Sequence, residues 1–174
     1  MKVFIGRYPK SLKAERKVNI RIDKWDTWSM DHTLAMIILP MLKQLQATKH
    51  GAPGSMPAFQ QTSNQYPQMC FTFYEDDDHP AWNEGHKQWT EIMDKMIWSF
   101  EQLLDENWDE QFWIVKPELD LDDLANNEGL DENGCKELKW KVEGECDWKA
   151  REEYANRIKE GLELFGKYYQ DLWD

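Results

Sequence analysis

The chain has few cysteines and no long apolar run, and both features limit the kinds of protein it can be. Its three cysteines, Cys70, Cys135 and Cys146, cannot all pair with one another and show no Cys-x-x-Cys spacing. We therefore expect reduced thiols in a cytoplasmic protein. The longest apolar run, residues 34–42, is too short to span a bilayer and is followed by Lys43, so we expect no membrane partner.

Basic residues are also in the minority. The chain has 21 Lys and Arg against 33 Asp and Glu, which gives a formal net charge of −12. An acidic protein of this kind repels duplex DNA and anionic membranes at long range, so we expect no duplex nucleic acid as a partner. A small phosphorylated ligand, held by a few local Lys or Arg side chains, is still compatible with this charge.

The sequence lacks the familiar catalytic motifs as well. It has no Gly-x-Ser-x-Gly, no phosphate-binding glycine loop and no dinucleotide fingerprint. Asp31-His32 and the acidic cluster at 76–79 lack the spacing of a His-Glu-x-x-His zinc site or of a calcium loop. We interpret the first as a helix cap and the second as a solvated turn, and we expect no catalytic residue, metal ligand or cofactor.

One enzyme hypothesis depends on Glu91-x-x-Asp94. This pattern is similar to half of the carboxylate set of all-helical, magnesium-dependent nucleotide pyrophosphohydrolases, whose second helix supplies Glu-x-x-Glu. The first predicted helix has no acid between Leu34 and Thr48. Glu152, Glu153, Glu160 and Glu163 could substitute for it, but an exposed charged helix face explains them more simply.

What the chain does contain is enough apolar material for one core. Hydrophobic residues make up 41% and aromatic residues 13%, with ten Trp, so we expect a folded protein despite a mean hydropathy of −0.82. The length of 174 residues fits a single domain over residues 1–174. Segments without periodicity predict surface loops at about 51–79 and 109–147.

Periodicity predicts three long helices and several short strands. Val18, Ile20 and Ile22 alternate with polar residues, which predicts a strand from about 17 to 23. Further short strands are expected at 2–5, 69–74, 112–115 and 138–142. The first helix should begin at Ser29 or Asp31 and kink at Pro40, and its apolar stripe is Leu34, Ile37, Ile38, Met41, Leu42 and Leu45. The second should begin at 78–79, before Pro80, with the stripe Trp82, Trp89, Met93, Met96, Ile97, Phe100, Leu103 and Leu104. The third should begin at 147, with the stripe Tyr154, Ile158, Leu162, Phe165, Tyr169 and Leu172. The predicted fold class is α+β, mainly helical, with three long amphipathic helices packed with a small antiparallel sheet.

The segment 24–33, KWDTWSMDHT, concentrates polar and aromatic groups at a strand-to-helix boundary. It predicts either a structural corner sealed by two buried indoles or a ligand-binding site. In the second case Trp25 and Trp28 would stack on a nucleobase, Thr27, Ser29 and His32 would supply polar contacts, and Arg21 and Lys24 would neutralise phosphate. We expect a split, with Trp28 in the core and Trp25 facing the ligand.

The same region carries a family resemblance. Residues 21–35 (RIDKWDTWSMDHTLA), 37–45 (IILPMLKQL) and 48–51 (TKHG) resemble a widespread family of tailed-phage proteins. Residues 93–102 (MDKMIWSFEQ) look like the middle helix of that family, and residues 161–169 (GLELFGKYY) with Leu172-Trp173 look like its C-terminus. The resemblance covers roughly half of the chain and is most specific in its first block.

This resemblance implies an anti-CBASS sponge, a small oligomeric phage protein that binds the cyclic nucleotide signals of bacterial immunity without cleaving them. A sponge would be a homo-oligomer in the cytoplasm of the infected bacterial host, would need no cofactor and would not be an enzyme. Two alternatives stay open from the residues. One is an acidic interaction protein that binds and inhibits a host protein, and the other is the magnesium-dependent pyrophosphohydrolase.

Overall fold

The computed structural model describes residues 1–7, 9, 15–59, 80–122, 135 and 137–173. Three long helices dominate this part of the chain: α1 (Met30–Thr48), α3 (Pro80–Leu104) and α5 (Trp148–Lys167). They are accompanied by two 3₁₀ turns, η1 (Glu110–Phe112) and η2 (Tyr169–Asp171), and by six short strands. The predicted α+β, mainly helical class is confirmed. The predicted strand at 69–74 and the acidic cluster at 76–79 lie outside the described residues.

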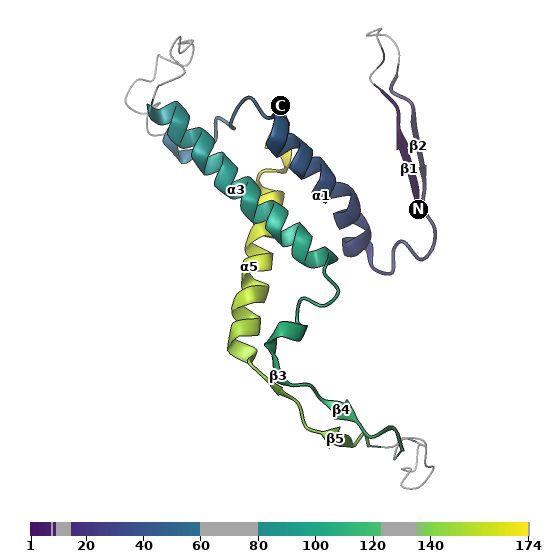
Figure 1. Cartoon of the computed structure of the whole chain (residues 1–174). Coiled ribbons are helices and arrows are strands. Elements are labelled where there is room, and N and C mark those ends of the chain that lie inside the picture. Colours follow the sequence, from purple (N-terminus) through teal and green to yellow (C-terminus); the bar gives the residue numbers. More distant parts are fainter. Residues whose placement is uncertain (8, 10–14, 60–79, 123–134, 136, 174) are drawn as a thin grey trace.

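α3 is the central helix and packs against both α1 and α5 (Figure 1). Its stripe forms most of the core, as predicted, and Pro80 stands at its first position, where its missing N–H is harmless. The fully buried side chains outside α3 include Met56, from the segment that follows α1, and Ala35 of α1. The buried hydrophobic cluster comprises Ala35, Leu42, Met56, Trp89, Met93, Met96, Ile97, Phe100 and Tyr168.

The C-terminal segment packs onto this core, but through Tyr168 instead of Tyr169 of the predicted stripe. The Tyr168 ring is buried and meets the Trp89 ring edge to face, with 5.5 Å between centroids. Leu172 also contacts the cluster, although Tyr169 and Trp173 are exposed. None of the helices among the described residues is both long and apolar enough to cross a membrane.

The strands form three separate antiparallel ribbons of two strands each, instead of the single small sheet expected. They are β1 (Lys2–Ile5) with β2 (Val18–Arg21), β3 (Trp113–Val115) with β6 (Glu145–Cys146), and β4 (Glu118–Leu119) with β5 (Trp140–Val142). The strands predicted at 2–5, 17–23, 112–115 and 138–142 are therefore present. Figure 1 shows the β1–β2 ribbon standing beside the helices and the other two ribbons extending from the far end of α5.

An aromatic cluster joins that far end to the helices. The Trp108 and Tyr154 rings stack with an interplanar angle of 3° and centroids 5.8 Å apart, and Phe112 meets Tyr154 edge to face. The Arg157 guanidinium lies 3.7 Å from the centroid of Trp98. These contacts hold η1 and the start of β3 against α5, because large rings bury much apolar area in a few contacts.

Helix α1 buries only part of its predicted stripe. It runs continuously through Pro40, and its core side carries Ala35 and Leu42, with Ile38, Leu39 and Leu45 partly buried against the cluster. Leu34 and Met41, which we expected in the core, are exposed. The reason is compositional: residues 34–42 are all apolar, so no polar residue marks the side of the helix that is left uncovered.

Candidate ligand-binding site

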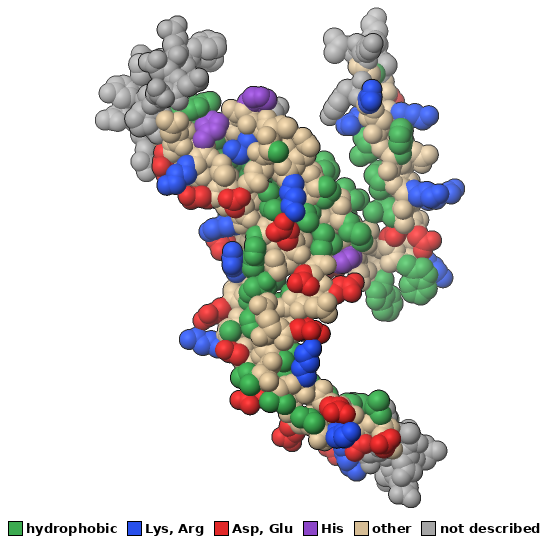
Figure 2. Space-filling view, in the orientation of Figure 1, with side chains coloured by type: hydrophobic (Ala, Val, Ile, Leu, Met, Phe, Trp, Pro, Cys, Tyr) green, Lys and Arg blue, Asp and Glu red, His purple; other side chains and the backbone are tan. Residues whose placement is uncertain are grey.

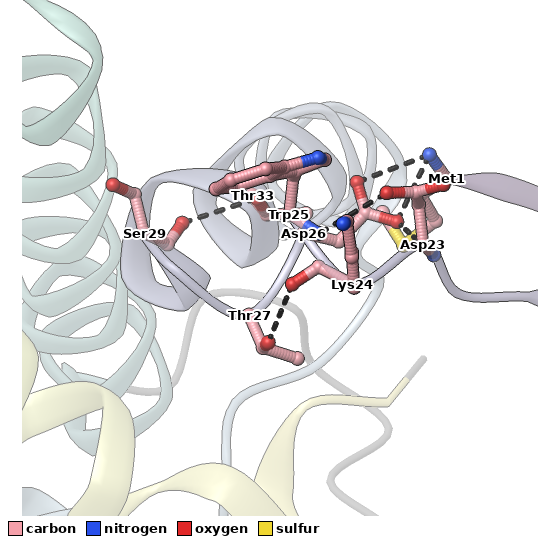
Figure 3. Close-up of polar contacts among 8 residues, drawn as sticks. All are labelled: Met1, Asp23, Lys24, Trp25, Asp26, Thr27, Ser29 and Thr33. Atoms are coloured by element: carbon pink, nitrogen blue, oxygen red, sulfur yellow. Dashed lines mark hydrogen bonds and ion pairs between the residues drawn. The ribbon is translucent and has the colours of Figure 1, made fainter.

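The segment between β2 and α1 is a compact turn built by two carboxylates (Figure 3). The Asp23 side chain accepts a hydrogen bond from the Trp25 N–H at 3.1 Å, and Asp26 accepts one from the Asp23 N–H at 2.6 Å. The Met1 ammonium also donates to Asp26, at 3.0 Å. These bonds hold the pKa of Asp26 below its ordinary value, chiefly through the Asp23 N–H and then through the ammonium. The first half of the turn is thus held by bonds among residues 23–26 and to Met1.

The two indoles of this turn face solvent. Trp25 is 66% exposed and Trp28 is 84% exposed. Their ring centroids lie 6.3 Å apart and their planes are tilted by 55°. The expectation that Trp28 seals the core is therefore wrong, and so is the interpretation of both rings as buried corner seals. Indoles exposed to this degree leave much of their ring surface accessible to a planar ligand.

The predicted cations lie close to the indoles in sequence, but only Lys24 is shown in contact with one. The Lys24 ammonium lies 4.9 Å from the centroid of Trp25. Arg21 ends β2, is exposed, and pairs across the ribbon with Lys2. The Thr27 hydroxyl donates to the Lys24 carbonyl at 3.1 Å, so this side chain stabilises the turn.

Neither predicted N-cap residue caps α1 through its side chain. Ser29 occupies the N-cap position without a side-chain hydrogen bond to the helix, and Asp31 lies within the first turn. The Ser29 carbonyl accepts both the N–H and the hydroxyl of Thr33, at 3.0 and 3.1 Å. The sequence pattern Ser-x-Asp gives the correct place for the helix start but not the bonding.

His32 lies in the helix interface. Its ring is half-buried, and Nδ1 is 3.3 Å from the Leu103 carbonyl oxygen at the end of α3. This contact joins the start of α1 to α3 across 71 positions of the chain. His32 therefore has a structural role in addition to its predicted contact with a ligand. The exposed turn before it is the better candidate for ligand binding.

The carboxylates of the enzyme hypothesis have other partners or face solvent. Glu91 and Asp94 are exposed on α3, and Asp94 accepts a hydrogen bond from the Gln46 amide of α1 at 2.6 Å. Lys95 pairs with Glu160 of α5 instead of leaving it for a metal. Among the residues that the structure describes, no three His, Cys, Asp or Glu side chains gather in a way that could hold a metal ion.

A cavity of about 740 Å³ lies between the second half of α1 and the C-terminal segment. It is open on one side, and its walls are mainly apolar, including Ile38, Met41, Leu45, Phe165 and Leu172. Ligand pockets commonly fall in this size range. No Lys or Arg is among its lining residues, so it does not suit a phosphate group.

Sequence reasoning missed the groups that build the turn. It did not assign Asp23 and Asp26 their bonds to backbone N–H groups or place Met1 beside Asp26. A signal existed for the bond between Asp23 and the Trp25 N–H, because Asp side chains often accept a hydrogen bond from the N–H two residues ahead. The partner of His32, Leu103, could not be found from sequence spacing.

Comparisons with protein-family models, with curated proteins and with solved structures found no match for this chain.

Proposed function

We propose that this protein is a phage-encoded, non-enzymatic binder that sequesters cyclic oligonucleotide signals of bacterial immunity. The single observation that carries the proposal is the exposed pair of indoles, Trp25 and Trp28, on a turn held by Asp23 and Asp26. The resemblance of residues 21–51 to the tailed-phage family supplies the ligand class.

The indole pair suits a ligand with more than one base. Stacking of a base on an aromatic side chain contributes about 1–3 kcal/mol and needs only a π face. A cyclic dinucleotide has two bases, and the turn offers two rings 6.3 Å apart. The 55° tilt excludes a parallel sandwich between them, so each base would stack on an outward face.

Charge near the indoles supports a phosphorylated ligand. Lys24 lies against Trp25, and Arg21 pairs with Lys2 at the end of the ribbon next to the turn. Cations at this spot would offset the repulsion expected from a net charge of −12. Binding without cleavage is consistent with His32, whose Nδ1 faces a carbonyl in the helix interface.

Calorimetry of the full chain with a panel of cyclic dinucleotides and cyclic trinucleotides tests the proposal. We expect at least one tight ligand that is recovered chemically unchanged after the complex is denatured by heat. Trp25→Ala and Trp28→Ala should each weaken the binding of this ligand. Trp140→Ala is the control, because it removes an indole of β5 that is 52% exposed and should leave the affinity unchanged. Absence of binding to every ligand of the panel would contradict the proposal, as would recovery of a cleaved product.

A further inference from the structure

The β1–β2 ribbon, called the arm below, has one entirely apolar face. Its register pairs Val3 with Ile20 and Ile5 with Val18, so these four side chains share a face. Lys2, Phe4, Asn19 and Arg21 lie on the opposite face. The four side chains of the apolar face are between 41% and 54% exposed. An isolated two-stranded ribbon is marginally stable in water, so this face needs a cover.

Helix α1 has a second apolar stripe that points away from the core. Met30, Leu34, Ile37 and Met41 follow one another at steps of four, three and four, which places them along one side of the helix. Met30, Leu34 and Met41 are exposed and Ile37 is half-buried. We call this set the outer stripe. It ends at Met41, which also lines the apolar cavity.

The arm and the outer stripe match in length and character. Four strand residues extend about 13 Å, and the outer stripe, from Met30 to Met41, rises about 17 Å along the helix axis. Figure 2 shows hydrophobic side chains on the arm and on the side of the helical body next to it. Both surfaces are β-branched or long aliphatic side chains, which pack well between a ribbon and a helix.

We propose that the apolar face of the arm docks on the outer stripe of α1 in a second copy of the chain, reciprocally, so that two copies form a symmetric dimer by exchanging arms. Each copy contributes one arm and one stripe, and the dimer therefore leaves neither surface open, as a two-fold interface requires. This inference does not depend on the proposed function.

Charge favours a second copy as the occupant. Residues 1–22, which contain the arm, have seven Lys or Arg and one acid, while the remaining 152 residues have 14 basic and 32 acidic residues. A basic arm is thus attracted to the acidic body of another copy. Within one chain the arm stands beside its own α1 (Figure 1), and the four side chains of its apolar face stay exposed, so the chain's own helix does not cover them.

Sedimentation velocity across a wide concentration range tests the first consequence. The parent chain should sediment as a dimer, and Ile20→Lys should raise the dimer dissociation constant about 100-fold or more, because a charge replaces a buried anchor. Asn19→Lys is the matched control, since it places the same charge on the opposite face of the same strand and should leave the dimer intact. Far-ultraviolet circular dichroism should show the same helical content in all three proteins.

Mixing two damaged chains tests the exchange itself. Ile20→Lys damages the arm, and Met41→Lys damages the outer stripe, so each variant alone should be monomeric. In their mixture, the intact arm of the Met41→Lys chain can dock on the intact stripe of the Ile20→Lys chain, and a heterodimer should form. Neither variant restores the other if each arm folds back on its own helix.

Every outcome bears on the proposal. A dimeric parent, monomeric single variants and a restored heterodimer support it. A monomeric parent overturns it, as does a dimer that tolerates Ile20→Lys or a mixture that stays monomeric. Trp25→Ala, which tests the proposed function, should leave the dimer unchanged, so the two proposals can fail separately.

Discussion

Ser99 of α3 lies directly against Gly161 of α5, with no room for a side chain at the glycine. Ser99 is fully buried, and a methyl group on Gly161 would overlap its hydroxyl and lie 2.5 Å from the Lys95 carbonyl oxygen. The position therefore requires the absence of a side chain, and it sets how deeply the α3 stripe is covered by α5.

Gly161→Ala should destabilise the fold by about 1–3 kcal/mol, the usual range for overpacking, because backbone atoms of α3 cannot move aside cheaply. Gly166→Ala is the matched control in the same helix, where a methyl group would meet nothing within 4 Å. It should stabilise the helix by about 0.5–1 kcal/mol through its propensity. Urea unfolding monitored by circular dichroism measures both. Equal effects of the two substitutions would refute the close approach.

The N-caps of α1 and α5 should respond differently to alanine. Asp147 accepts a hydrogen bond from the Ala150 N–H at 3.0 Å, so Asp147→Ala should lower the free energy of unfolding by about 0.5–2 kcal/mol. Ser29 makes no such bond, and Ser29→Ala should change stability far less. Thermal melts of the two variants provide the comparison, and an equal loss at Ser29 would show that its side chain does cap α1.

The exposed indoles should be dispensable for folding. Because Trp25 and Trp28 are both exposed, truncation of either to Ala should leave the melting temperature nearly unchanged. Trp89→Ala, by contrast, removes a buried ring of the core and should cost about 3–5 kcal/mol. A melting temperature for Trp28→Ala as low as that of Trp89→Ala would restore the structural interpretation of this residue.

The turn should loosen in acid. The folded pKa of Asp26 is lowered by the Asp23 N–H and by the Met1 ammonium, so the ionised form contributes stability to the turn. That contribution is complete above about pH 4 and is lost as the pH falls through the lowered pKa. Carboxyl-carbon chemical shifts should give a titration midpoint for Asp26 below that of an unstructured Asp. Asp26→Asn should alter the Trp25 amide shift already at neutral pH.

His86 should give the protein a second pH dependence, which arises from burial of the ring and not from hydrogen bonds. Its Nε2 is buried without a hydrogen-bond partner among the described residues, and its ring lies 4.6 Å from that of Trp82. Burial, followed by the nearby Lys49 ammonium, lowers the pKa of His86. The unfolded chain then takes up the proton first, so stability should fall as the pH drops from about 7 through the lowered folded pKa, and level off below it.

His86→Phe keeps a ring at this position and removes the titration. Denaturant unfolding at a series of pH values should therefore show a shallower slope for the variant than for the parent in this range. A slope that is unchanged would place the titrating group elsewhere.

Helix positions followed from periodicity because one side of each long helix is buried. Strand positions followed from alternating or β-branched residues, although both strands of the arm are exposed throughout. The stripe of α3 from Trp89 to Phe100 is the clearest case. The pattern failed in α1, where an unbroken apolar run gives no contrast between sides, so Leu34 and Met41 were assigned to the wrong surface. The pattern also did not predict that the strands form three separate ribbons instead of one sheet, because pairing between distant strands depends on the tertiary fold.

The candidate site was located by composition but not in detail. The density of polar and aromatic groups at residues 24–33 identified the turn, yet the exposure of Trp28 could not be read from its place before an apolar helix. Exposure depends on the path of the turn after β2, where Asp23 and Asp26 accept hydrogen bonds from backbone N–H groups. The bond from His32 to Leu103 likewise joins residues that only the folded chain brings together.

The described methionines of the helical body lie either in its core or on its surface. Met56, Met93 and Met96 are fully buried in the core, while Met30, Met36 and Met41 are exposed along α1. Peroxide converts an accessible thioether to a polar sulfoxide, and the reaction follows accessibility. In a free chain all three α1 thioethers should oxidise early, whereas in an arm-exchanged dimer Met30 and Met41 should react later than Met36. The order in which the methionines of α1 oxidise thus indicates which side of this helix is covered.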